Sequence, residues 1–161
     1  MPNDLGETMR LEPGQKAPTF RGVDHNNAEL SSADFAGSDL LVYFYPKVFT
    51  PGCTTEACDF RDRYQTFIGA GYAIVGISPD EPEELARFRD EYDLPFSLIS
   101  DSDHAIAEAF GAWGMKKNYG REYEGLIRST IAIDGDGIVT AVWYNVKAKG
   151  HAERIERSVG D

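Results

Sequence analysis

Hydrophobic and polar positions alternate along the chain in short blocks that predict strands and helices in turn. Residues 40–45 and 72–77 are apolar throughout, which is typical of strands buried on both faces of a sheet. Residues 54–68 carry apolar side chains three or four positions apart, and this spacing predicts a helix. Residues 81–92 predict another, because a proline and an acidic first turn favour a helix N-terminus.

Two hairpins are expected near the ends of the chain. Residues 19–23 and 28–31 flank a run of turn-forming residues, and residues 126–133 and 138–144 flank the turn Asp-Gly-Asp-Gly. The remaining predicted elements are a strand over residues 96–99 and helices over residues 103–110 and 150–159. We therefore predict an α/β fold whose mixed central sheet is flanked by helices and carries an N-terminal β-hairpin.

Length and composition are those of one domain with a leading tail. Residues 1–17 are rich in proline, glycine and charge without periodicity, so we expect a tail there and a single domain over residues 18–161. The chain is 42% hydrophobic and 27% charged, which is ordinary for a globular domain and too apolar for a disordered one.

The charge of the chain argues against two classes of partner. Sixteen basic residues against 27 acidic ones leave a net charge of −11, which repels nucleic acids and anionic membranes. No apolar run approaches the roughly 20 residues of a membrane span, and the first residues lack the features of a signal peptide. We expect a cytoplasmic protein with neither nucleic acid nor membrane as its partner.

The chain has only two cysteines, Cys53 and Cys58, so it has no disulfide framework and its cysteines are expected to matter through reactivity. Cys53 falls in the first turn of a predicted helix, directly after a buried strand and a Pro/Gly turn. The positive end of the helix dipole and the free N–H groups there favour thiolate over thiol. Cys53 is therefore a candidate nucleophile, and the alternative is a small buried core residue.

The residues around Cys53 favour the first alternative. The pattern Pro46-x-x-x-Thr50-x-x-Cys53 resembles the active-site signature of the peroxiredoxins, thiol peroxidases with a thioredoxin-like fold. The longer string FYPKVFTPGCTTEACDFRD is similar to the PrxQ subfamily, the bacterioferritin comigratory proteins. DSDHAIAEAFGAWGMKK, GLIRSTIAIDGDG and KAKGHAERI continue the resemblance in the same order, over nearly everything after the tail.

The resemblance implies a role for each matched residue. Cys53 would attack the distal oxygen of hydrogen peroxide or an organic hydroperoxide, giving a cysteine sulfenic acid and water or an alcohol. Cys58 would resolve that sulfenic acid as a disulfide. Thr50 would hydrogen-bond the peroxide, Pro46 would shield the site from water, and Arg128 would supply a cation from a distant strand.

Elementary geometry and electrostatics sharpen these expectations. Residues five apart in a helix have Cα atoms about 8.6 Å apart, whereas a disulfide needs less than about 7 Å, so the helix must unwind before Cys58 reaches Cys53. Arg128 lies in a run predicted to be a core strand, where it needs an anionic partner. Glu56 is expected to serve the helix dipole, although in the family it belongs to the active-site network. Lys116, Lys117 and Arg121 are expected in an exposed loop.

The implied reaction needs an external dithiol, which in this family is usually thioredoxin and sometimes glutaredoxin. No bound cofactor is implied, because sulfur stores the two electrons. The three histidines, His25, His104 and His151, show no ligand spacing with the cysteines, so no metal site is expected. The subfamily tends to be monomeric or a weak homodimer.

Two other functions stay open at this point. A thiol-disulfide reductase is disfavoured because Cys-x4-Cys is not the Cys-x-x-Cys pair of thioredoxin-type sites. A non-catalytic redox sensor or holdase would use the same disulfide as a switch, and would oxidise once where a peroxidase turns over many equivalents of peroxide.

Overall fold

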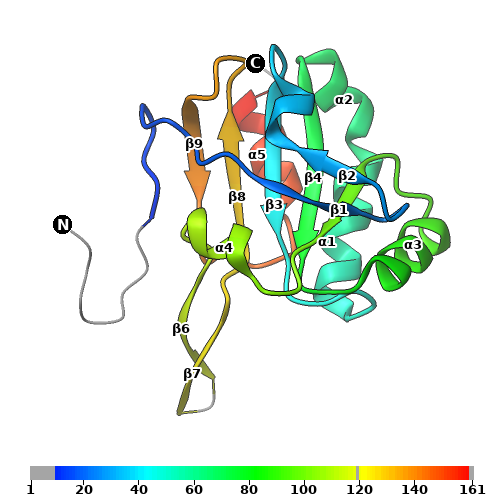
Figure 1. Ribbon diagram of the computed structural model, residues 1–161, viewed down its shortest axis with the longest axis vertical. Helices are drawn as coiled ribbons and strands as arrows, with labels where there is room; N and C mark the ends of the chain where they lie inside the picture. Colours follow the sequence, from blue (N-terminus) through cyan, green and yellow to red (C-terminus); the bar gives the residue numbers. More distant parts are fainter. Residues whose placement is uncertain (1–9, 119, 160–161) are drawn as a thin grey trace.

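A computed structural model describes residues 10–118 and 120–159. Its centre is a seven-stranded mixed sheet in the order β2-β1-β5-β4-β3-β8-β9 (Figure 1). The strands are β1 (Arg21–Asp24), β2 (Glu29–Ser31), β3 (Asp39–Phe44), β4 (Tyr72–Ser78), β5 (Ser97–Ser100), β8 (Ser129–Ile133) and β9 (Val139–Trp143). Strands β3, β4 and β5 are parallel, and the outer strands pair antiparallel with their neighbours. The predicted mixed sheet and N-terminal hairpin are confirmed.

Helices cover both faces of the sheet, as the uniformly apolar central strands require. Leu41 and Tyr43 of β3 point into one core with α1 (Pro51–Asp62), α2 (Tyr64–Gly69), α3 (Pro82–Glu91) and α5 (His151–Val159). Leu40 and Val42 point into the other core, which α4 (Ala105–Ala109) and the short helix η1 (Ser32–Phe35) help to cover (Figure 1). No helix in the described part of the chain is long and apolar enough to cross a membrane.

The helix predicted over residues 54–68 is two helices, and the first begins earlier than expected. Thr50 is the N-cap of α1, and the helix ends at Asp62. The next residue, Arg63, is no longer helical, with φ −107° and ψ 8°. The apolar spacing runs on across the break because Phe60 and Phe67, on either side, are both buried in the same core. That spacing therefore could not reveal the break.

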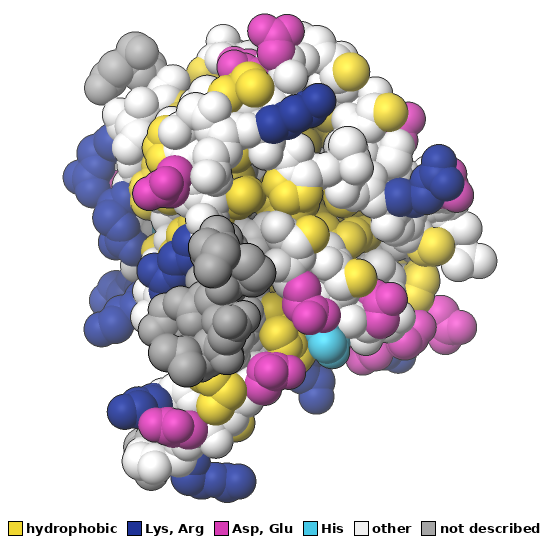
Figure 2. Space-filling model, turned by 60° about the vertical axis from the view of Figure 1, so that its left-hand side comes forward, with side chains coloured by type: hydrophobic (Ala, Val, Ile, Leu, Met, Phe, Trp, Pro, Cys, Tyr) yellow, Lys and Arg dark blue, Asp and Glu magenta, His cyan; other side chains and the backbone are white. Residues whose placement is uncertain are grey.

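The loop predicted around Lys116, Lys117 and Arg121 is wrong. Residues Trp113–Asn118 form β6 and residues Arg121–Leu126 form β7, and the two pair as an antiparallel hairpin outside the main sheet. The hairpin projects from the body of the molecule, with basic and acidic side chains at its tip (Figures 1 and 2).

The strand predicted over residues 126–133 is also interrupted, so Arg128 does not lie in a strand. Strand β7 ends at Leu126 and β8 begins at Ser129. Between them the backbone bonds elsewhere: Ile127 N–H donates to Ala112 O at 2.7 Å, and Arg128 O accepts from Val146 N–H at 3.0 Å. The chain thus leaves the sheet at Arg128, whose side chain reaches Cys53 and Glu56 of α1.

Most of the predicted tail, residues 1–9, lies outside the described residues. The part that follows lies along the start of β9, where Gly14 N–H donates to Val139 O at 2.8 Å and Ala17 N–H donates to Gly137 O at 2.9 Å. The domain boundary at residue 17 stays a prediction.

Candidate active site

The loop between β3 and α1 is fixed to the end of the neighbouring strand β4. Tyr45 N–H donates to Ile77 O at 3.1 Å, and Val48 N–H donates to Oδ2 of Asp80 at 2.9 Å. The same carboxylate oxygen accepts the Ser78 hydroxyl at 2.8 Å. Pro46 is half-buried within this anchored segment. The loop therefore delivers the start of α1 in a defined position.

Cys53 lies in the first turn of α1, as predicted, and is 1% exposed. The first helical N–H to bond within the chain is that of Thr54, which donates to Thr50 O at 2.9 Å. The N–H groups of Gly52 and Cys53 precede it and are the donors that a helix leaves without intrahelical partners. The Thr50 hydroxyl does not cap the helix and donates instead to Lys47 O at 2.8 Å.

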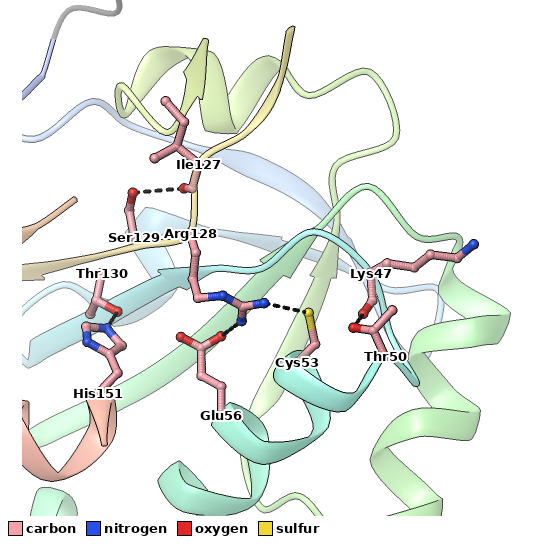
Figure 3. A network of polar contacts seen from close by, with 9 residues as sticks. All are labelled: Lys47, Thr50, Cys53, Glu56, Ile127, Arg128, Ser129, Thr130 and His151. Carbon is pink, nitrogen blue, oxygen red and sulfur yellow. Dashed lines mark hydrogen bonds and ion pairs between the residues drawn. The ribbon is translucent and has the colours of Figure 1, made fainter. Parts of the chain in front are cut away.

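The side chain of Arg128 joins Cys53 to Glu56 (Figure 3). Its Nη2 donates to the Cys53 sulfur at 3.3 Å, and its Nη1 forms an ion pair with Oε1 of Glu56. The expectation that Arg128 would have an anionic partner is confirmed. Burial lowers the pKa of Arg128, but attraction to Glu56 and Cys53 outweighs it and raises that pKa, so the guanidinium stays charged.

The dipole role expected for Glu56 is wrong. Because α1 begins at Pro51, Glu56 lies beyond the first turn, and its side chain is fully buried. Burial raises the pKa of Glu56 to about 7, against the opposing effect of Arg128. Its second oxygen, Oε2, is buried and has no hydrogen-bond partner among the described residues.

Cys58 lies on the same uninterrupted helix as Cys53, and both are free thiols. Its side chain is half-buried, and burial raises the pKa of its thiol against the opposing effect of Arg61. In an ideal helix the two Cα atoms are about 8.6 Å apart, so this conformation does not allow a disulfide between them. The sulfur that faces Arg128 is that of Cys53 alone.

Comparisons with known proteins identify the family. The model of the AhpC/TSA family matches residues 13–142. The chain belongs to this family and is a peroxiredoxin. It is 49% identical over 155 residues to a putative peroxiredoxin of Mycobacterium tuberculosis (96% of this chain, 99% of the relative) and 42% identical over 153 residues to peroxiredoxin Bcp of Bacillus subtilis (95% and 98%).

Solved structures agree with this assignment. The bacterioferritin comigratory protein of Xanthomonas campestris matches with a TM-score of 0.82 and 34% identity, over 87% of this chain and 89% of that one. A PrxQ mutant of Xylella fastidiosa matches with a TM-score of 0.86 and 27% identity, over 93% and 96%. The thioredoxin-like fold and the resemblance to PrxQ are confirmed, and the peroxiredoxin is a thiol-dependent peroxidase.

Two polar residues near the site of this peroxiredoxin were not identified as site residues from the sequence. One is Asp80, which anchors the loop before Cys53. The other is His151, fully buried at the start of α5, whose Nε2 lies 2.7 Å from the Thr130 hydroxyl (Figure 3). Burial, then Arg154 and Arg128, lower the pKa of His151 to about 4, so its ring is neutral at pH 7. The signal in the sequence is the position of Asp80, three residues after the end of the buried strand predicted over residues 72–77.

Proposed function

We propose that Cys53 is the peroxidatic residue and that it reduces hydrogen peroxide and organic hydroperoxides. The observation that carries this proposal is the hydrogen bond from Arg128 to the Cys53 sulfur, which stabilises a thiolate inside a nearly closed site. The thiolate attacks the distal peroxide oxygen, the S–O bond forms as the O–O bond breaks, and the leaving oxygen takes a proton. The products are a sulfenic acid on Cys53 and water or an alcohol.

The other site residues act on the peroxide as it reacts. The N–H groups of Gly52 and Cys53 and the Arg128 guanidinium are donors for the oxygens on which charge develops, and each preorganised donor contributes about 3 to 4 kcal/mol. In this proposal the Thr50 hydroxyl leaves Lys47 O to hydrogen-bond the bound peroxide. Pro46, half-buried beside the loop, limits access of water.

Cys58 is proposed to resolve the sulfenic acid. Its thiolate attacks the sulfur of oxidised Cys53, a disulfide forms, and hydroxide leaves as water. Because the two residues are about one and a half turns apart on α1, this step requires local unwinding of the helix. The reduced enzyme has the folded α1 described here, and the oxidised enzyme has a locally unfolded one.

A dithiol protein of the thioredoxin or glutaredoxin class is the proposed reductant. It returns two electrons to the disulfide and closes the cycle without a bound cofactor. We propose a monomer or weak homodimer that works in the cytoplasm.

The experiment that tests this function is a thiol count after one equivalent of hydrogen peroxide, with peptide mapping by mass spectrometry. We expect rapid loss of both thiols into a Cys53–Cys58 disulfide. Cys53→Ser should abolish all oxidation, and Cys58→Ser should stop the reaction at a sulfenic acid that dimedone traps. Two thiols that persist for minutes would overturn the assignment, and a disulfide that forms without turnover in the presence of a thioredoxin system would favour a redox sensor.

A further inference from the structure

The lysines of this acidic protein are gathered at one end of the fold. The chain has a net charge of −11 and only six lysines. One of them, Lys16, forms a β-bridge with Ile138, the residue before β9. The other five are Lys47, Lys116, Lys117, Lys147 and Lys149, and they belong to three segments around Cys53.

The segment 144–150 lies directly against the active site. Val146 N–H donates to Arg128 O at 3.0 Å, and a Cβ added to Gly52 would lie 3.7 Å from Cβ of Ala148. Lys147 and Lys149 flank Ala148, and both side chains are exposed. No aspartate or glutamate occurs in this segment.

The β6–β7 hairpin, which ends two residues before Arg128, has one basic face. In its register Lys116 is opposite Tyr123, and because side chains alternate along a strand, Arg121 shares this face. Lys117, Glu122 and Glu124 belong to the other face, where Lys117 is ion-paired with Glu122 at 3.5 Å. The Lys116 ammonium lies 5.9 Å from the Tyr123 ring centroid. Lys116 is half-buried, and burial and the charge of Arg128 lower its pKa, while Cys53 opposes them.

Exposed apolar side chains occur among these lysines. Phe49, directly before Thr50, is 45% exposed and rests on Phe88 and Tyr92, with ring centroids 5.2 and 6.2 Å away. Tyr123, on the basic face of the hairpin, is 42% exposed, whereas Met115, which is 53% exposed, lies on the opposite face with Glu122 and Glu124. Exposed phenylalanine, methionine and tyrosine are the residue types enriched at protein interfaces.

We propose that Phe49, the β6–β7 hairpin and segment 144–150 form a docking surface for a dithiol reductase whose own surface is acidic around its cysteine pair. The lysines are spread over three segments, and Lys47 points away from Cys53 (Figure 3), so they do not converge on one small anion. A broad basic rim around apolar contacts fits a protein surface of opposite charge, and such complementarity raises association rates by about 10- to 1,000-fold. The inference rests on the proposed function, since only the Cys53–Cys58 disulfide needs this partner.

The docked partner would transfer two electrons from its own dithiol to the Cys53–Cys58 disulfide. One thiolate of the partner attacks the disulfide, which forms a mixed disulfide and releases one thiolate of this chain. The second thiolate of the partner then attacks the mixed disulfide. The partner ends oxidised, and Cys53 and Cys58 end reduced.

The test measures the reductive half of the cycle by itself. The full chain is oxidised with one equivalent of hydrogen peroxide, freed of excess, and mixed in a stopped-flow instrument with a reduced thioredoxin of net negative charge or with dithiothreitol. The quantity compared is the ratio of the two second-order rate constants, thioredoxin over dithiothreitol, at ionic strengths from about 0.02 M to about 0.5 M. The variants are Lys147→Gln/Lys149→Gln and Lys116→Gln, with Lys16→Gln as the matched control.

We expect the ratio to fall steeply with salt in the wild type and to be about fivefold lower or more in the double variant at low salt. The curves should converge at high salt, and Lys16→Gln should follow the wild type. Equal ratios in all proteins, or a thioredoxin that does not reduce the disulfide, would overturn the docking surface and leave the peroxidase intact. Failure of the disulfide to form would instead overturn the proposed function. If the lysine variants slow only oxidation by peroxynitrite, a negatively charged peroxide, the surface serves anionic substrates and the docking proposal is wrong.

Discussion

Arg128 donates a hydrogen bond to the sulfur of Cys53 at 3.3 Å although 75 positions separate the two residues in the chain. The same guanidinium holds the buried Glu56 through its other terminal nitrogen. A planar fork with several donors can make both bonds at once, whereas an ammonium is a single point charge. The identity of the cation therefore matters as well as its charge.

Replacement of Arg128 by lysine should keep the charge and lose one of the two bonds. We expect Arg128→Lys to lower the second-order rate constant for Cys53 oxidation by about 100-fold, the cost of one preorganised donor. The measurement is stopped-flow oxidation by hydrogen peroxide, with urea unfolding to confirm that the variant is folded. A rate within about threefold of the wild type would mean that charge alone suffices.

Because Gly52 has no side chain, the guanidinium of Arg128 can lie close to the backbone at this position. A Cβ at this position would lie 3.3 Å from Nη2 of Arg128, which is tight enough to push the guanidinium away from the sulfur. We expect Gly52→Ala to slow oxidation of Cys53 by about 10-fold or more, because small misplacements of reacting groups are costly. Stability should be unchanged or slightly higher, since alanine favours the helix.

Gly69→Ala is the matched control for this prediction. Gly69 also lies in a helix, and an added Cβ there meets no atom of the described residues within 4 Å. Its oxidation rate should equal that of the wild type. An oxidation rate in Gly52→Ala equal to that in Gly69→Ala would show that Arg128 does not need its present position.

The sequence alone was sufficient to predict those parts of the site that depend on the local pattern of residues. The apolar run of β3 followed by a Pro/Gly turn placed Cys53 in a first helical turn, and the run is apolar because both faces of β3 are buried. Arg128 was found only through the resemblance to a family. Its approach to Cys53 depends on a break between β7 and β8, and the apolar residues on both sides of that break, 126–127 and 131–133, conceal it.

The wrong predictions for Glu56 and for the β6–β7 hairpin each have a physical cause. The role expected for Glu56 depended on where the helix begins. In a helix that begins at Thr54, Glu56 belongs to the first turn and interacts with the helix dipole. Because α1 begins at Pro51, Glu56 lies in the second turn, where its side chain is buried. The hairpin β6–β7 was missed because its strands pair with each other in solvent. Polar, mostly exposed strands show no hydrophobic alternation from which to predict them.

Burial of Glu56 makes stability depend on pH in a defined direction. Its pKa is raised from 4.5 to about 7 in the folded protein, so the folded state binds this proton more tightly than the unfolded state. The unfolding free energy contributed by Glu56 should therefore fall as pH rises from about 4.5 to about 7. The difference in unfolding free energy between the wild type and Glu56→Gln, from urea titrations across that range, should decrease accordingly. Parallel pH curves for the two proteins would contradict the prediction.

His151 should show the opposite slope over nearly the same range. Its pKa is lowered from 6.5 to about 4, so the unfolded state binds this proton more tightly than the folded state. The unfolding free energy contributed by His151 is then present above about pH 6.5 and is lost as pH falls toward 4, by about 3 kcal/mol in all. Because the contributions of Glu56 and His151 oppose each other, the pH curve of the wild type alone cannot separate them.

Single variants separate the two contributions. The difference in unfolding free energy between the wild type and His151→Gln should increase from pH 4 to pH 6.5, while the corresponding difference for Glu56→Gln decreases from pH 4.5 to pH 7. Thr130→Val removes the hydroxyl 2.7 Å from Nε2 and leaves a neutral buried ring without that partner, so it should destabilise at every pH by about 1 to 3 kcal/mol. A His151→Gln difference that is flat with pH would mean that His151 titrates alike in the folded and unfolded chains.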